Sequence, residues 1–186
     1  MIDLHCHILP GLDDGSDSLE TSLEMAAMAA EHGIRHIAAT PHCVTGSARE
    51  GAANVEMLEE LLREEHIPIH VYPGMEIFGT YDTAYLLREG RLLTLNGSRY
   101  PLIEFAFDTD GEEETEILQS VIDAGYTPLV AHPERYQCVC YGPRIVNLWK
   151  EMGCLFQVNR GSLLGRFGSG ARDVGMELVR RGFASV

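Results

Sequence analysis

Histidines and carboxylates with the spacing of metal ligands recur along the sequence. His5 and His7 are separated by one residue, and alternate residues of an extended segment point the same way, so both imidazoles can reach one ion. Imidazole and carboxylate ligands without an evident set of thiolates suit manganese, iron or zinc. The further candidate ligands are Asp13 or Asp14, His42, Glu76, Glu104 and His132.

This set of side chains is large enough for more than one ion. Two ions about 3.5–4 Å apart can hold the attacking and the leaving oxygen of a phosphoryl displacement. Arg135 follows His132 closely in the segment His-Pro-Glu-Arg, and its guanidinium could bind phosphate oxygens or form a surface ion pair. The residues therefore predict a metal-dependent phosphoesterase.

Short apolar segments that alternate with helical stretches would position these residues. Most of the candidate ligands follow a predicted strand, and the carboxyl ends of parallel strands meet on one face of a sheet or barrel. Asn-Gly at 96–97 indicates a tight turn, which predicts a hairpin of residues 92–95 and 100–105. Strands are expected at 2–5, 34–40, 69–75, 127–131 and 155–159, with one more starting at 183–186. Helices are expected from 17 or 18 to 32 and at 50–65, 80–89, 112–124, 143–152 and 171–181.

The alternation of strands and helices predicts an α/β fold with a largely parallel sheet, either open or closed into a barrel. The 186 residues are enough for one domain with a substantial core, which we expect to span 1–186. The net charge of −14 argues against a nucleic-acid-binding surface. No apolar run has the length of a membrane span and no signal peptide is visible, so a cytoplasmic location is expected. The odd number of cysteines, 5, predicts reduced thiols.

Several motifs in order along the chain resemble those of a known family. They are IDLHCHILPGLDDG at 2–15, TPH at 40–42, GME at 74–76, IEF at 103–105 and HPER at 132–135. The chain resembles the polymerase and histidinol phosphatase (PHP) superfamily, and specifically its bacterial manganese-dependent protein tyrosine phosphatases of the CpsB/YwqE type. The resemblance runs from Met1 to Val186.

This resemblance implies a distorted (β/α)7 barrel with up to three divalent ions. His5, His7 and Glu76 would hold one ion, and Glu76, Glu104 and His132 a second. Asp14 and His42 would belong to the third, and a metal-bound hydroxide would attack phosphorus while Arg135 holds the phosphoryl group. Arg135 and His42 are thus the expected catalytic residues. The implied substrates are phosphotyrosine tails of tyrosine autokinases that control capsular or exopolysaccharide synthesis.

The family continues into an Asp-x-His motif that completes the first and third ions, and this chain ends at Val186, before that motif. We therefore expect an incomplete site and a barrel that lacks its last strand. An open sheet edge can pair with another chain, so a homo-oligomer is possible.

Three alternatives remain open. Residues 42–49 fit the His-Cys-x2-Gly-x2-Arg loop of cysteine-based phosphatases, in which the thiolate of Cys43 would be the nucleophile. The same Cys-x5-Arg spacing recurs at 138–144 and 154–160, so that pattern carries little weight. The second alternative is a non-catalytic metal-binding module. The third is another PHP phosphoesterase, such as a histidinol-phosphate-type phosphatase or a nuclease, and the acidic charge disfavours the nuclease.

Overall fold

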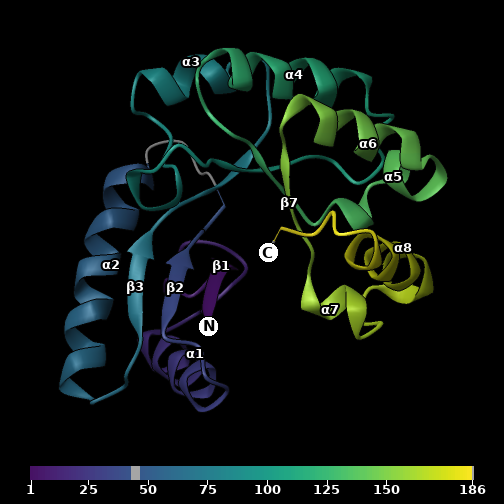
Figure 1. Cartoon of the computed structure of the whole chain (residues 1–186). Coiled ribbons are helices and arrows are strands. Elements are labelled where there is room, and N and C mark those ends of the chain that lie inside the picture. The colour runs from purple at the N-terminus through teal and green to yellow at the C-terminus, as the bar shows by residue number, and fades with distance from the viewer. Residues whose placement is uncertain (43–46, 186) are drawn as a thin grey trace. The chain divides into compact units, whose positions relative to one another are not determined.

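The computed structural model describes residues 1–42 and 47–185 (Figure 1). The chain divides into two compact units. The first unit consists of Met1–Ile77 and Glu89–Pro101, and the second of Phe78–Arg88 and Leu102–Val186. The single domain expected over 1–186 stays a prediction. No helix in the described ranges is long and apolar enough to cross a membrane.

The first unit is built on a sheet of three parallel strands in the order β1-β2-β3. Its buried core joins these strands to two helices, through residues such as Ala26, Ile37, Leu58 and Val71. The elements are β1 (Ile2–Cys6), α1 (Leu19–Glu31), β2 (His36–Ala39), α2 (Ser47–Glu64), β3 (His70–Pro73) and the 3-10 turn η1 (Leu95–Gly97). Apart from the predicted strand at 92–95, the predicted strands and helices of this unit are thus confirmed, within a few residues at each end.

Helix α1 begins at a side-chain cap. The hydroxyl of Ser18 accepts a hydrogen bond from the backbone N–H of Thr21, which satisfies one of the unpaired donors at a helix start. The buried hydroxyl of Ser22 then donates to the carbonyl of Ile8 at 2.7 Å. Through Ser22, α1 holds the loop that connects it to β1.

The ends of the three strands lie side by side because backbone hydrogen bonds tie them together. The N–H of Thr40 donates to the carbonyl of Cys6 at 2.9 Å, and the N–H of Glu76 donates to the carbonyl of Pro41 at 3.0 Å. A Cβ atom at Gly74 would lie 3.2 Å from the carbonyl oxygen of Ala39, so a glycine lets the chain after β3 pass close to β2. The segments that carry the first candidate ligands therefore meet.

The second unit contains a parallel sheet with the neighbouring strands β5 (Leu102–Glu104), β6 (Leu129–Ala131) and β7 (Leu155–Gln157). Strand β4 (Glu76–Phe78) carries the chain from the first unit into the second. Trp149, Tyr136 and Phe156 are the largest fully buried side chains of the chain. The helical elements are α3 (Thr83–Arg88), α4 (Glu112–Asp123), η2 (Pro133–Arg135), α5 (Gln137–Tyr141), α6 (Pro143–Met152), α7 (Arg160–Leu163) and α8 (Gly168–Arg180).

Most of the predicted order holds in the second unit as well, and α6 begins and ends at the predicted residues. Near the C-terminus, Ala184 forms an isolated parallel bridge with Phe156, where a further strand was expected; Val186 lies outside the described residues. The sequence analysis missed β4, η2, α5 and α7. These elements have five residues or fewer, which is too short for a periodic pattern to be recognised.

The predicted hairpin of residues 92–95 and 100–105 is wrong. Asn96 and Gly97 do turn the chain with positive φ values of 50° and 66°, but the residues before them form no strand. Instead β5 pairs in parallel with β6. Pro101 precedes β5 and has no N–H to donate, so it interrupts the ladder that a hairpin would need.

Candidate metal centre

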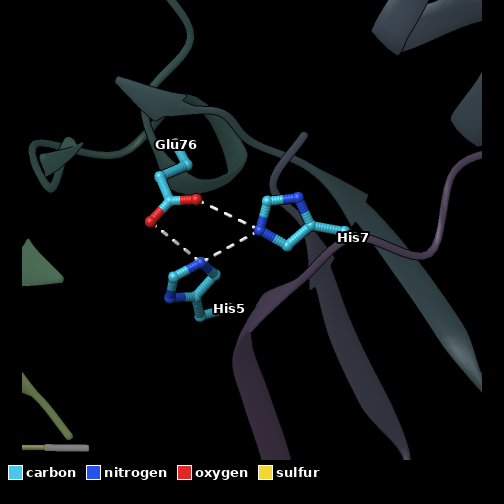
Figure 2. A group of neighbouring side chains, drawn as sticks. All are labelled: His5, His7 and Glu76. Carbon is cyan, nitrogen blue, oxygen red and sulfur yellow. Dashed lines mark hydrogen bonds and ion pairs between the residues drawn. The ribbon is translucent and has the colours of Figure 1, made fainter. Parts of the chain in front are cut away.

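His5, His7 and Glu76 form a compact group in the first unit (Figure 2). The Nε2 atoms of His5 and His7 lie 3.1 Å from the two carboxylate oxygens of Glu76, one to each oxygen. The same two nitrogens are 3.2 Å apart. Figure 2 shows both imidazole rings directed at the carboxylate from the segment that contains β1, as the His-x-His spacing predicts.

The donor set of this group fits a divalent cation. Glu76 is only 1% exposed, and an ionised carboxylate at such a depth needs partners of positive charge. Two imidazole nitrogens and a carboxylate are ligands that zinc, iron and manganese accept. The three ligand atoms lie within 4.8 Å of one another, so one ion could contact them all after small adjustments.

A second group shares His7 and adds Asp14 and His42. His42 lies between the two groups, because its Nδ1 is 3.3 Å from Glu76 and its Nε2 is 3.5 Å from Asp14. The side chain of Asp14 is 80% exposed. The structure thus brings together all the predicted ligands that belong to the first unit, with Asp14 on the solvent side.

Asp13 has a different place from Asp14. Its side chain is only 4% exposed, and its Oδ2 accepts hydrogen bonds from Nδ1 of His7 at 2.7 Å and from the backbone N–H of His42 at 2.8 Å. Its other oxygen accepts from the N–H of Gly15 at 3.0 Å. A carboxylate on Nδ1 fixes the ring orientation and leaves Nε2 for a metal. Asp13 thus contacts the His7 ring on the Nδ1 side, a difference from Asp14 that the sequence of the two adjacent aspartates does not reveal.

His7 and Asp13 shift each other's pKa in opposite directions. Burial alone lowers the pKa of His7, but its hydrogen bonds to Asp13 and Glu76 outweigh burial and raise it to about 10. Burial raises the pKa of Asp13, but hydrogen bonds from His7, His42 and Gly15 outweigh this and lower it to about 2. Negative charge therefore gathers around His7, and a cation bound at Nε2 would replace the proton there.

Glu104 and His132 form the corresponding pair in the second unit, where Glu104 is the last residue of β5 and His132 directly follows β6. Oε2 of Glu104 lies 3.9 Å from Nε2 of His132. His132 has a positive φ of 33°, and its backbone N–H donates to Oε1 of Gln157 at 3.1 Å. The predicted convergence of strand ends is thus also found within this unit.

Arg135 is held by aromatic rings. The central carbon of its guanidinium lies 4.0 Å from the ring centre of Phe107 and 4.4 Å from that of Phe167. Within the described ranges, no ion pair joins this guanidinium to a carboxylate. The surface ion pair considered for Arg135 is therefore not observed there, and the two phenylalanines are contacts that the sequence analysis missed.

The cysteine-based alternative depends on Cys43, which lies outside the described residues. The two other cysteines with the same spacing to an arginine are unsuited to a thiolate mechanism. Burial raises the pKa of Cys138 to about 11 and that of Cys154 to about 12. The four described cysteines form no disulfide, as expected for reduced thiols.

Comparisons with known proteins found matches that span most or all of the chain. The whole chain, residues 1–186, matches the family described as capsular polysaccharide synthesis, CpsB/CapC. The chain is 39% identical over 183 residues to the tyrosine-protein phosphatase YwqE of Bacillus subtilis (strain 168), covering 96% of this chain and 72% of that protein. It is 34% identical over 163 residues to the tyrosine-protein phosphatase CpsB of Streptococcus pneumoniae, covering 86% and 67%.

A solved structure also superimposes closely. It comes from work on YwqE from Bacillus subtilis and CpsB from Streptococcus pneumoniae, which are described as unique metal-dependent tyrosine phosphatases. The TM-score is 0.93 at 37% sequence identity, over 99% of this chain and 76% of that one. This likeness confirms the α/β fold with parallel strands. Because the family model matches residues 1–186 of this chain, the chain belongs to the CpsB/CapC family of capsular polysaccharide synthesis.

Proposed function

We propose that this chain is a metal-dependent protein-tyrosine phosphatase that hydrolyses phosphotyrosine. The observation that carries the proposal is the buried carboxylate of Glu76, whose oxygens lie 3.1 Å from Nε2 of His5 and of His7. Membership of a family whose relatives are named tyrosine-protein phosphatases supports it. The acidic protein has few positive groups for a phosphate, so bound cations would dominate the local field.

The proposed metal ligands come from both units of the chain. His5, His7 and Glu76 hold one divalent ion, and Asp14 and His42 belong to another. Glu104 and His132 are further ligands, and the sharing of an ion by Glu76, Glu104 and His132 stays a prediction. Divalent ions supply Lewis-acid charge and lower the pKa of water.

Arg135 binds the phosphoryl oxygens through the N–H groups of its guanidinium. The absence of an ion pair between this guanidinium and a carboxylate in the described ranges supports this role, because those donors remain available. His42 lies 3.3 Å from Glu76 and 3.5 Å from Asp14, so it links the buried and the exposed part of the ligand set. We therefore propose Arg135 and His42 as catalytic residues.

Manganese is the metal we expect, in up to three ions, although iron or zinc would also suit the ligands. The substrate would be the phosphotyrosine tail of a tyrosine autokinase that controls capsular or exopolysaccharide synthesis, which agrees with the description of the family. A distorted (β/α)7 barrel, a cytoplasmic location and self-association through an open sheet edge stay predictions.

The test is turnover of a phosphotyrosine peptide by the chain before and after chelation, together with its metal content. We expect chelation to abolish turnover and manganese to restore it, and we expect Cys43→Ser to leave it intact. Chelator-resistant turnover that disappears in Cys43→Ser would instead establish the thiolate mechanism. A folded, manganese-loaded chain without turnover would indicate a metal-binding module.

A further inference from the structure

The aromatic contacts of Arg135 form a defined arrangement in the second unit. Arg135 belongs to η2, which follows β6, while Phe107 follows β5 and Phe167 follows β7 and α7. The three side chains thus come from segments after successive parallel strands. This end of a parallel sheet is where ligands bind in α/β folds.

Both rings contact the guanidinium without neutralising it. Their centres are 4.0 Å and 4.4 Å from its central carbon, which is well inside the range of cation–π attraction. A guanidinium is planar, and its five N–H donors point outward in that plane. Contacts with aromatic rings restrict the rotamer of Arg135 while they leave N–H donors available to a phosphoryl oxyanion.

Each ring is held by further contacts. Phe107 packs edge-on against His132, with ring centres 5.8 Å apart, and stacks on Tyr136 at 6.3 Å. Phe167 lies against Gly161 of α7, where an added Cβ atom would be only 2.8 Å from Cε2 of its ring. Gly161 therefore gives Phe167 the space that it occupies.

Both rings that contact Arg135 are partly exposed to solvent. Phe107 is 43% exposed and Phe167 is 47% exposed, although a phenylalanine gains stability mainly from burial. Their contact with the one charged group of η2 that could bind phosphate gives them a function.

We infer that Phe107 and Phe167 are positioning residues that orient Arg135 for the binding of a phosphoryl oxyanion. This inference rests on the proposed function only in assigning that oxyanion to the substrate. The two rings act through the arginine, and they restrict its guanidinium before the ligand arrives, which reduces the entropy lost on binding.

The direct test measures the affinity of the manganese-loaded chain for inorganic phosphate by calorimetry. We expect the double variant Phe107→Leu/Phe167→Leu to bind phosphate roughly fivefold to tenfold more weakly, the scale of a lost cation–π contact. Phe107→Tyr keeps the ring and should retain the affinity. Tyr85→Leu removes a comparably exposed ring of the same unit, 58% exposed, and should also leave the affinity unchanged.

Two further variants separate positioning from other roles. In an Arg135→Ala background, the leucine substitutions should cause no additional loss, because their effect passes through the arginine. Gly161→Ala removes no side chain, but it displaces the ring of Phe167. It should therefore weaken phosphate binding, as the double leucine variant does. Circular dichroism and metal content show whether each variant is folded and loaded.

Unchanged phosphate affinity in the double leucine variant would overturn the inference. So would an equal loss in the presence and absence of Arg135. If the KM for a phosphotyrosine peptide rose while phosphate affinity stayed constant, the rings would contact the substrate's ring instead, which also overturns positioning. If the chain shows the expected pattern of phosphate binding but hydrolyses no phosphotyrosine, the proposed function fails and the inference stands.

Discussion

The two compact units surround their strand-end residues in different ways. In the first unit, a buried carboxylate lies within 3.3 Å of nitrogen atoms of three histidines, and a second buried carboxylate, Asp13, holds one of those rings from behind. In the second unit, Glu104 and His132 are 3.9 Å apart, and the nearby Arg135 is held by aromatic rings. Contacts between carboxylates and histidines hold the first group together, whereas aromatic contacts hold Arg135 in the second.

This difference follows from what each group is expected to bind. Ligands for a cation must be neutral or negative, so imidazoles and carboxylates gather, and bound ions offset their mutual repulsion. A residue that binds an oxyanion must keep its positive charge and its donors available. Aromatic faces suit that purpose, because they attract a guanidinium without competing for its N–H groups. We expect substitutions in the two units to separate accordingly.

The largest effect should come from Glu76→Gln in the first unit. A neutral amide would leave the imidazoles of His5, His7 and His42 without their shared carboxylate, so we expect metal content to fall sharply. Turnover should drop by more than about 100-fold, beyond the usual cost of losing a residue that only supports a ligand. Metal analysis and peptide turnover measure this. Glu56→Gln, on an exposed position of α2, is the control, and equal metal content in both variants would refute the assignment.

Asp13→Asn should have the next largest effect. It retains a similar shape but weakens the hydrogen bond that orients His7, so manganese affinity should fall by roughly 10–100-fold. Titration of the metal-free chain with manganese measures this affinity. Asp82→Asn, at an exposed position, should bind manganese like the unaltered chain. A normal affinity in Asp13→Asn would show that the ring of His7 is oriented by other contacts.

In the second unit, Glu134→Ala should act on stability. Oε1 of Glu134 accepts hydrogen bonds from the hydroxyl of Ser162 at 2.6 Å and from the N–H of Asn159 at 3.1 Å. Removing this buried acceptor leaves two donors unsatisfied, so the free energy of unfolding should fall by about 1–3 kcal/mol. Urea unfolding measures the change. Glu134→Gln keeps an acceptor and should lose less, whereas the same loss in both variants would point to the charge instead.

The smallest effect is expected for Ser18→Ala at the start of α1. Loss of the cap on the N–H of Thr21 should lower the free energy of unfolding by about 1 kcal/mol. Manganese affinity should stay the same, because the hydrogen bonds described for the Ser18 side chain reach Thr21 and no metal-ligand side chain. A clear loss of affinity would mean that the helix start helps to set the geometry of the ligands. Urea unfolding and manganese titration distinguish the two outcomes.

The sequence was sufficient to predict the parts of the site that depend on local geometry. His5 and His7 point the same way because extended backbone repeats every two residues, and Figure 2 shows this arrangement. The alternation of apolar and helical segments predicted parallel strands, and these in turn predicted that Glu76 would meet the two histidines. The motifs at 2–15 and 132–135 further indicated the family.

The tertiary structure decided what depends on contacts between distant segments. It assigned Asp13 to His7 and Asp14 to the exposed side, although the two residues are adjacent in one loop. It paired β5 with β6 instead of with the preceding segment, and it placed Phe107 and Phe167 on Arg135 across 28 and 32 residues of sequence. Such contacts arise when separate elements pack together, and the free energy of that packing has no signature in the local pattern of residues.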